Sequence, residues 1–294
     1  MATERSHTIG FWHSYKPCRC ASQPGILIIS DRSQAIRATL NAPHSGWHPS
    51  SAYHAYCIRH MASNFNSRFK STEDKRYLIN VAYNPSKEGC NWYLDILGTL
   101  SHDMVDWALC FRKELWLQHC DEGRRYGHMT TNLLKCINAG LKGTRNLPVA
   151  AIVWAMYERL QQLFMRRGRE AHAQLQGGQI YSQQLLAAID KNRESLPMVL
   201  VTHCDRRASV FNVEEMEPVD GWSQTSYWVH MTERTCDCGL FQSLHFPCQH
   251  ALAACAAASI EWGIFVDPVY TMASVFKVYE REFSLILDEK IWPP

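Results

Sequence analysis

The sequence lacks the features that mark several large classes of protein. Its longest apolar stretch, residues 147–157, is too short to span a lipid bilayer. Residues 1–10 are polar and contain no apolar segment of the kind found in secretory signals, so we expect an intracellular protein that is not secreted. The net charge is only +2, which excludes a polybasic nucleic-acid binder as a description of the whole chain. A hydrophobic content of 46% against 20% charged residues excludes long-range disorder.

Cysteine is present but sparse, with 12 in 294 residues, which is too few for a disulfide scaffold. Because the sequence shows no export signal, we expect these cysteines to be reduced thiols. A cluster of cysteines therefore indicates a metal site before it indicates a disulfide.

Charge is distributed unevenly along the chain. Residues 112–170 contain 11 Lys and Arg against 5 Asp and Glu, whereas residues 201–294 contain 6 against 13. Two separate modules and two solvated faces both account for this asymmetry. Arg166, Arg167 and Arg169 are expected to close a helix, where they could contact phosphates or complement the dipole of the helix C-terminus.

Hydrophobic periodicity predicts an α+β fold that is mostly helical. A buried strand at 25–29 delivers Asp31 at its C-terminal tip, and Pro148 stands where a helix begins. Residues 77–83 are open between a strand and a short helix. Further helices are expected at 33–41, 50–70, 92–118 and 133–141, and strands at 199–211 and 226–231. We expect three parts, with boundaries at 1–100, 101–196 and 197–294, of which the second is helical.

The most specific motif is Cys236-Asp-Cys238, followed after nine residues by Cys248-Gln-His250. Structural zinc takes four thiolate or imidazole ligands in a tetrahedron. The first pair shares one side of a strand or tight turn, and the second pair stands at the start of an alanine-rich helix. We therefore expect a small ββα unit closed by a structural Zn²⁺ on Cys236, Cys238, Cys248 and His250.

Other cysteines and histidines leave alternatives open. Cys57 and His60 share a helix face and could hold a metal or form a buried pair. Asp31 could cap the helix at 33–41. Other possible metal ligands are His245, Cys255, and Cys204 with His203. Each of these could instead be an ordinary residue of a helix, loop or strand.

The spacing of the cysteine and histidine motif resembles the SWIM zinc finger, with Trp228-Val-His230 as its strand and residues 246–252 as its helix. Upstream blocks look like those of the Mutator-like transposases of plants, and the match covers most of the chain from about residue 21. The blocks are residues 28–32, residues 57–60, residues 126–132 with Asn138, and a tail with Tyr279, Phe283 and Trp292-Pro293.

The catalytic domain of that family is similar to ribonuclease H, and three carboxylates hold two divalent metal ions. Asp31 matches the second carboxylate and Glu88 lies where the third is expected, while residues 1–30 contain no aspartate for the first. Lys135 and Cys136 also depart from the family pattern. The resemblance therefore implies an N-terminally truncated ribonuclease H-like remnant without catalysis of its own, in which Mg²⁺ has a place only if the site were intact.

The resemblance implies a zinc-binding protein of the nucleus, derived from a transposase, whose finger contacts DNA or protein. Two alternatives are an active transposase with three catalytic acids and a domesticated transcriptional regulator of the same family. The acidic region around the finger favours a protein surface for it, and the basic segment at 112–170 favours phosphate contacts.

Overall fold

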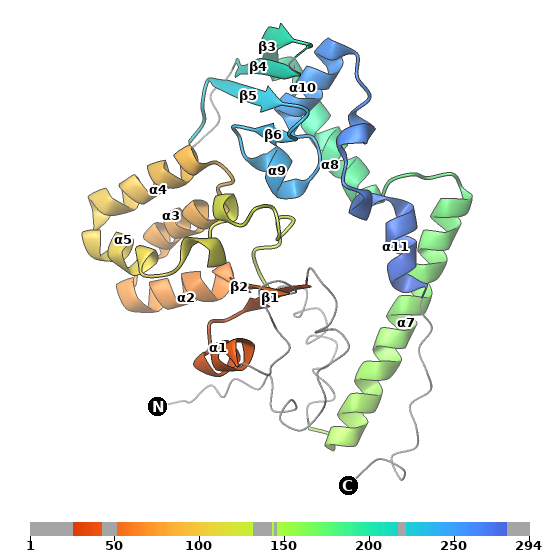
Figure 1. Ribbon diagram of the computed structural model, residues 1–294. Helices are drawn as coiled ribbons and strands as arrows, with labels where there is room; N and C mark the ends of the chain where they lie inside the picture. Colours follow the sequence, from red (N-terminus) through yellow and green to blue (C-terminus); the bar gives the residue numbers. More distant parts are fainter. Residues whose placement is uncertain are drawn as a thin grey trace.

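The structure is a computed structural model that describes residues 26–42, 52–131, 143, 146–207, 209–216 and 222–280. Figure 1 shows a helical layer beside a small parallel sheet, one long helix, and a C-terminal unit built on a four-stranded sheet. The fold is α+β and mostly helical, as the sequence predicts. No helix in the described part of the chain is both long and apolar enough to cross a membrane.

The N-terminal sheet consists of two parallel strands, β1 (Ile26–Ser30) and β2 (Ala52–Tyr56). β1 confirms the predicted strand, and helix α1 (Gln34–Asn41) follows it. The helix predicted at 50–70 is wrong over residues 52–56, because these residues pair with β1 along their whole length. Helix α2 (Ile58–Phe69) begins only after Cys57 and ends at Lys70, which is in the left-handed conformation.

Four helices form the helical layer: α2, α3 (Thr72–Tyr83), α4 (Lys87–Leu100) and α5 (His102–Leu109). Residues 77–83 are therefore helical. Serine hydroxyls begin α3 and α4, where Ser71 accepts the N–H of Asp74 at 3.2 Å and Ser86 accepts the N–H of Gly89 at 3.4 Å. Two short 3₁₀ turns, η2 (Lys113–Leu115) and η3 (Gln118–Cys120), then cross the layer.

The core of the helical layer lies between these helices and the segment that follows them. Leu94, Leu97 and Trp116 are buried in it and Trp107 and Phe111 pack against it, whereas Trp92 is 39% exposed. Each fully buried large side chain contributes roughly 1.5–3 kcal/mol. The buried members with the largest side chains are Phe65, Leu78, Leu97, Trp116, Leu117 and Met129.

The long helix α7 (Val149–Gln176) begins after Pro148, as predicted, and packs against α11 (Met272–Tyr279). The rings of Phe164 and Tyr279 lie 5.2 Å apart. The expectation that Arg166, Arg167 and Arg169 close a helix is wrong, because α7 continues for two more turns to Gly177. A single interior glycine at 168 weakens a helix without ending it.

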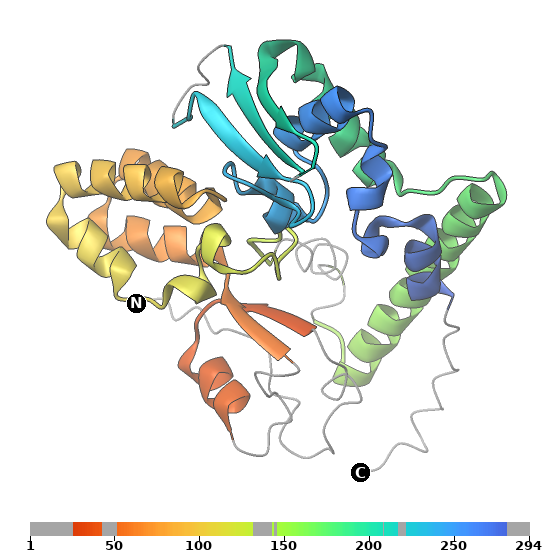
Figure 2. The same cartoon turned by 45° about the horizontal axis from the view of Figure 1, so that its top comes forward.

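The C-terminal unit is a four-stranded antiparallel sheet in the order β3-β4-β5-β6. Its strands are β3 (Val199–Asp205), β4 (Val210–Glu215), β5 (Ser226–His230) and β6 (Thr235–Cys236). The strand predicted at 226–231 is confirmed, whereas the one predicted at 199–211 is wrong as a single strand, because the chain turns after Asp205 and pairs back on itself as β4. Helices α8 (Gln183–Glu194) and α10 (Gln249–Ala258) lie on one side of it (Figure 2). The remaining elements are η4 (Leu196–Met198), α9 (Leu240–Leu244), η5 (Trp262–Phe265) and η6 (Pro268–Tyr270).

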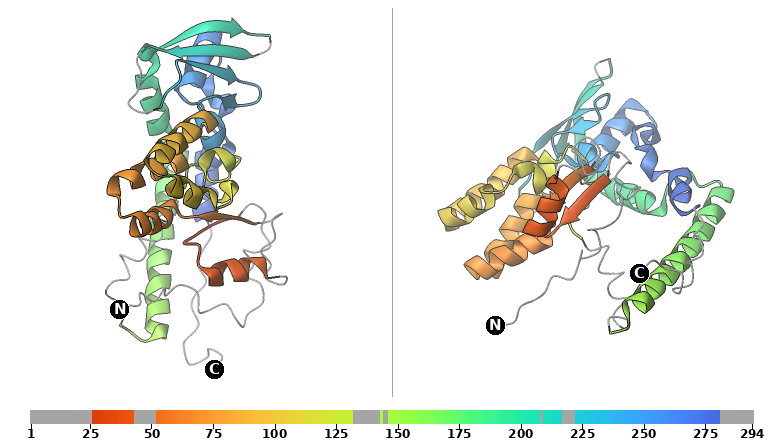
Figure 3. Two further views of the ribbon diagram at one scale, coloured as in Figure 1. Left: turned by 90° about the vertical axis from the view of Figure 1, so that its left-hand side faces the viewer. Right: turned by 60° about the horizontal axis from the view of Figure 1, so that its bottom comes forward.

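The C-terminal unit docks on the helical layer through close backbone contacts, and Figure 3 shows the sheet at one end of the molecule beyond the helices. Gly239 lies against the backbone of Pro85, so closely that a Cβ at 239 would overlap its carbonyl. His245, at the end of α9, lies against Gly123 and stacks on Tyr126 with ring centroids 4.4 Å apart. The position of the finger relative to the helices is therefore set by glycines that admit no side chain.

Candidate metal centre

Cys236 and Cys238 are held by a hairpin and a tight turn. Cys236 ends β6, opposite Val229 of β5, and Cys238 follows it in the turn. The turn is closed by Gly239, whose φ of 78° suits glycine and whose N–H donates to the carbonyl of Cys236 at 2.8 Å. The two thiols of the Cys-x-Cys pair are therefore positioned by backbone geometry.

Helix α9 fixes this turn from the other side. The amide side chain of Gln242 accepts the N–H of Cys236 at 3.0 Å and donates to the carbonyl of Cys236 at 2.9 Å. Asp237 extends the pairing with β5, since its N–H donates to the carbonyl of Trp228 and its carboxylate accepts the N–H of Trp228 at 2.8 Å. The N–H and the carbonyl of Cys236 are therefore both hydrogen-bonded, and the turn is fixed on both sides.

The second ligand pair stands at the start of α10. Cys248 is the N-cap of this helix, and His250 lies in its first turn. Asn192 of α8 donates to the carbonyl of Pro247 at 3.1 Å and so anchors the entry to the helix. The predicted switch from strand to helix is confirmed, and it directs all four side chains toward one point.

The ligand atoms of Cys236, Cys238, Cys248 and His250 all lie within 4.8 Å of one another. The Nδ1 atom of His250 lies 3.6 Å from the sulfur of Cys236 and 4.0 Å from that of Cys248. Bonds of 2.0–2.3 Å from a tetrahedral zinc ion to nitrogen and sulfur place such atoms about 3.5–3.8 Å apart. The donor set and its spacing therefore fit Zn²⁺ as a structural metal.

The charges of the four side chains also require a cation. Contacts with Cys238 and Cys248, together with burial, raise the pKa of the Cys236 thiol. Burial opposes ionisation of Cys248, but its contacts with the other thiols and His250 outweigh burial and lower its pKa. Three thiolates at this spacing, two of them buried, would repel one another, and a bound divalent cation allows all three to ionise.

Glu215 of β4 holds the imidazole of His250 from behind. Its Oε1 lies 3.0 Å from Nε2 of His250, which leaves Nδ1 facing the sulfur atoms. Gln249 donates to the same oxygen at 2.6 Å, and the ring of Tyr227 stacks on the imidazole at 4.0 Å. A carboxylate on the second nitrogen fixes the tautomer and orientation of a zinc-bound histidine.

The sequence did not reveal Glu215. It precedes His250 by 35 positions, and no local spacing connects the two. The alternation along β4, in which Phe211 and Val213 face the core, places Glu215 on the same face of the strand. A carboxylate on the buried face of a strand near the motif was the one available signal.

The rival ligands lie outside the cluster. His245 bonds to the carbonyl of Gly123 at 2.9 Å through Nε2, and burial raises the pKa of the Cys255 thiol to about 12. Cys57 occupies the position before α2, and its sulfur lies 3.5 Å from the hydroxyl oxygen of Thr131. Cys204 is exposed on β3. Within the described ranges, the cluster at 236–250 is the one group of three or more His, Cys, Asp or Glu side chains close enough to hold a metal.

Asp31 and Glu88 each make local bonds at the start of a helix. Asp31 accepts the N–H of Ser33 at 3.0 Å, and Ser33 rather than Asp31 caps α1 by accepting the N–H of Ile36. Glu88 accepts the hydroxyl of Ser86 at 3.0 Å in the first turn of α4. Their catalytic assignment stays a prediction. Lys135, Cys136, Asn138 and the tail residues Phe283 and Trp292-Pro293 lie outside the described residues.

Residues 227–259 match the family described as the SWIM zinc finger. This range contains all four ligands and the strand, turn and helix that carry them. No curated protein and no solved structure matches the chain. The C-terminal unit therefore contains a SWIM zinc finger, with Zn²⁺ as its structural metal.

Proposed function

We propose that the chain is a zinc-dependent binding protein, derived from a Mutator-like transposase, whose SWIM finger contacts a protein partner in the nucleus. The observation that carries this proposal is the outer face of the finger's sheet. Trp228 is 44% exposed there, and its ring lies 5.8 Å from that of His203 on β3. Leu200, on the same face by register, is 54% exposed.

Carboxylates surround this apolar patch. Glu214 pairs in register with Leu200, and Asp237 accepts the backbone N–H of Trp228. The side chains of Glu214 and Asp237 are exposed. An exposed tryptophan is a frequent anchor of protein interfaces, whereas a phosphate backbone is repelled by carboxylates. The face therefore suits a protein surface that carries basic side chains.

We assign contacts with DNA to the basic segment at 112–170. Arg166 and Arg167 are exposed on α7, although both pair with Glu170, at 3.9 Å and 3.1 Å. Exposed pairs of this kind exchange readily with phosphate because each contributes little to stability. We assign binding, not catalysis, to the chain, because Asp31 and Glu88 bond to neighbouring residues and belong to no metal-binding cluster among the described residues.

The proposed division into residues 1–100, 101–196 and 197–294 belongs to the same proposal. Two hydrophobic cores cross its boundaries. One contains residues from Tyr56 to Met129, on both sides of position 100, and the other joins α8 to Phe246 and Leu252, on both sides of position 196. Separate expression of the three parts would test the division.

We thus assign phosphate contacts to the basic segment and protein contacts to the finger. Duplex DNA binding by the zinc-loaded chain, measured across a salt series, tests this assignment. Replacing Arg166 and Arg167 with alanine should flatten the slope of log affinity against log salt by about 2, since each lost phosphate contact removes roughly 0.9. Trp228→Ala should leave the affinity and the slope unchanged. Loss of DNA binding in Trp228→Ala, or an unchanged slope in the arginine variant, contradicts the proposal.

A further inference from the structure

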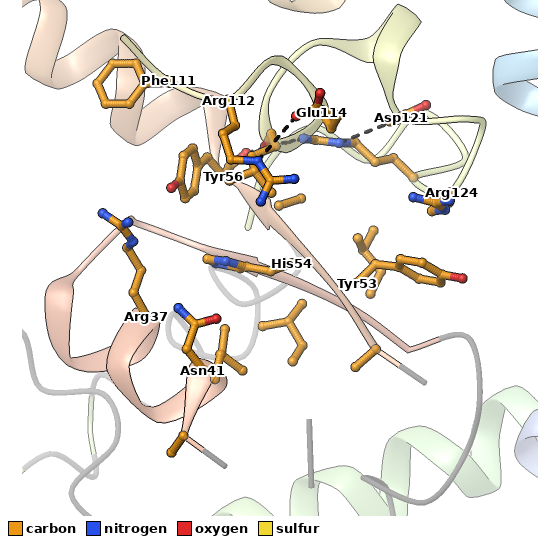
Figure 4. A pocket seen from close by; sticks show the side chains of 18 of the residues that line it. Arg37, Asn41, Tyr53, His54, Tyr56, Phe111, Arg112, Glu114, Asp121 and Arg124 are labelled. Carbon is orange, nitrogen blue, oxygen red and sulfur yellow. Dashed lines mark hydrogen bonds and ion pairs between the residues drawn. The ribbon is translucent and has the colours of Figure 1, made fainter. Parts of the chain in front are cut away.

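A cavity of about 1150 Å³ lies against the N-terminal sheet, remote in sequence from the zinc ligands. All five residues of β2 line it, together with Leu27 and Ile28 of β1. Helix α1 borders the cavity on one side and residues 110–125 border it on the other (Figure 4). Neither Asp31 nor Glu88 lines it.

The lining of this cavity is cationic. Four arginines face two acidic residues, a balance of two positive charges. One arginine is already neutralised, because Arg125 and Asp121 form an ion pair at 3.5 Å with both side chains at most 4% exposed. Arg125 also donates to the carbonyl of Tyr56 and so links the segment at 110–125 to β2.

Of the other three arginines, Arg124 is ion-paired with Glu122 and lies over the ring of Tyr53, which leaves Arg37 and Arg112 for a ligand. Arg37 makes no ion pair or hydrogen bond through its guanidinium among the residues that the structure describes. Arg112 pairs with Glu114 at 3.5 Å, but the two side chains are 76% and 58% exposed, so the pair is weak. Figure 4 shows the guanidinium groups of Arg37 and Arg112 on either side of the space above His54.

The floor of the cavity contains a histidine that bonds to a serine. His54 of β2 bonds to the hydroxyl of Ser30 at 2.7 Å. Burial, followed by the charges of Arg37 and Arg125, lowers the pKa of His54. The imidazole is therefore neutral near pH 7 and adds no positive charge to the lining.

We propose that this cavity binds a phosphate-bearing ligand, with Arg37 and Arg112 as its two anion contacts. A phosphate monoester carries a charge of about −1.5 to −2 near pH 7 and three acceptor oxygens, so one phosphate group can engage both guanidinium groups. Guanidinium groups bind phosphate oxygens through paired hydrogen bonds. The volume of about 1150 Å³ exceeds the need of a phosphate alone and lies just above the range of roughly 300–1,000 Å³ for pockets of small organic ligands. The site uses no residue of the zinc finger.

The phosphate has two sources, a free nucleotide-like ester or a strand of nucleic acid, and three probes separate them. Inorganic pyrophosphate and AMP are titrated into the full zinc-loaded chain by calorimetry, and a short oligo(dT) strand by fluorescence anisotropy. Arg37→Ala and Arg112→Ala are each expected to weaken binding about tenfold or more, the usual loss for a charge-assisted hydrogen bond. Arg76→Ala is the matched control, because Arg76 is exposed on α3 and does not line the cavity.

Binding of pyrophosphate or AMP that depends on Arg37 and Arg112 but not on Arg76 supports a site for free phosphate esters. Binding of oligo(dT) alone, with the same dependence, supports the same chemistry and assigns it to a nucleic-acid strand. No binding of any probe, or an equal loss in all three variants, overturns the proposal. Thermal melting followed by circular dichroism checks folding, and Arg112→Ala carries the test if Arg37→Ala melts early, because the Arg112 side chain is largely exposed.

Discussion

Replacing Gly239 with alanine should break the contact between the zinc finger and the helical layer. Gly239 has a φ of 78°, and it follows Cys238 in the turn that holds the first ligand pair. A Cβ at this position would overlap the backbone carbonyl of Pro85, between α3 and α4. The backbone of Pro85 cannot rotate away as a flexible side chain would.

Two separate terms determine the size of the effect. Alanine in the left-handed conformation costs about 1–2 kcal/mol wherever it stands. Overlap with a packed backbone group adds about 1–3 kcal/mol. Gly178 separates the two terms, because its φ is also 78° and a Cβ there would meet no atom within 4 Å. Gly178→Ala should therefore show the backbone term alone.

Urea denaturation of the zinc-loaded chain measures both variants. Gly178→Ala should lower the free energy of unfolding by about 1–2 kcal/mol and Gly239→Ala by about 2–5 kcal/mol. Equal losses in the two variants would refute the reasoning, because they would show that Pro85 does not restrict residue 239. A smaller loss in Gly239→Ala than in Gly178→Ala would refute it as well.

Two further predictions concern single side chains. Glu215→Gln should weaken zinc binding about tenfold or more in a chelator competition, because it removes the carboxylate that orients His250. The control Glu214→Gln, on the exposed side of β4, should leave the zinc affinity unchanged. Equal zinc affinities in the two variants would count against the role of Glu215. NMR titration should place the pKa of His54 below its ordinary value of about 6.5, since burial lowers it, and a measured pKa at or above 6.5 is the contrary result. Because the folded state binds this proton less readily than the unfolded state, the stability that His54 contributes is complete above pH 6.5 and declines as the pH falls below it.

The zinc ligands could be predicted from the sequence because all four lie within fifteen positions and their spacing is set by local structure. A hairpin, a glycine turn and a helix N-terminus each place a side chain by backbone geometry alone. Strands in the C-terminal unit were predictable for the same reason, since their alternation is local. The zinc site is thus a property of a short segment.

Non-local contacts could not be predicted in this way. The helical spacing of Tyr53 and Tyr56 favoured a helix, yet parallel pairing with β1 makes residues 52–56 a strand. His245 stood near the metal motif in sequence, but the fold places it against Gly123, 122 positions away. Such contacts depend on how distant segments meet, and a single sequence does not encode that in any local pattern.

Zinc content per chain is the measurement that tests the metal centre most directly. Native mass spectrometry of the full chain should find one tightly held zinc ion, which Cys248→Ser combined with His250→Ala should remove. Cys204→Ser is the matched control, because this exposed cysteine lies outside the cluster and its loss should leave the zinc in place. A folded chain without zinc, or one that retains its zinc in the double variant, would contradict the assignment of Cys236, Cys238, Cys248 and His250 as the ligands.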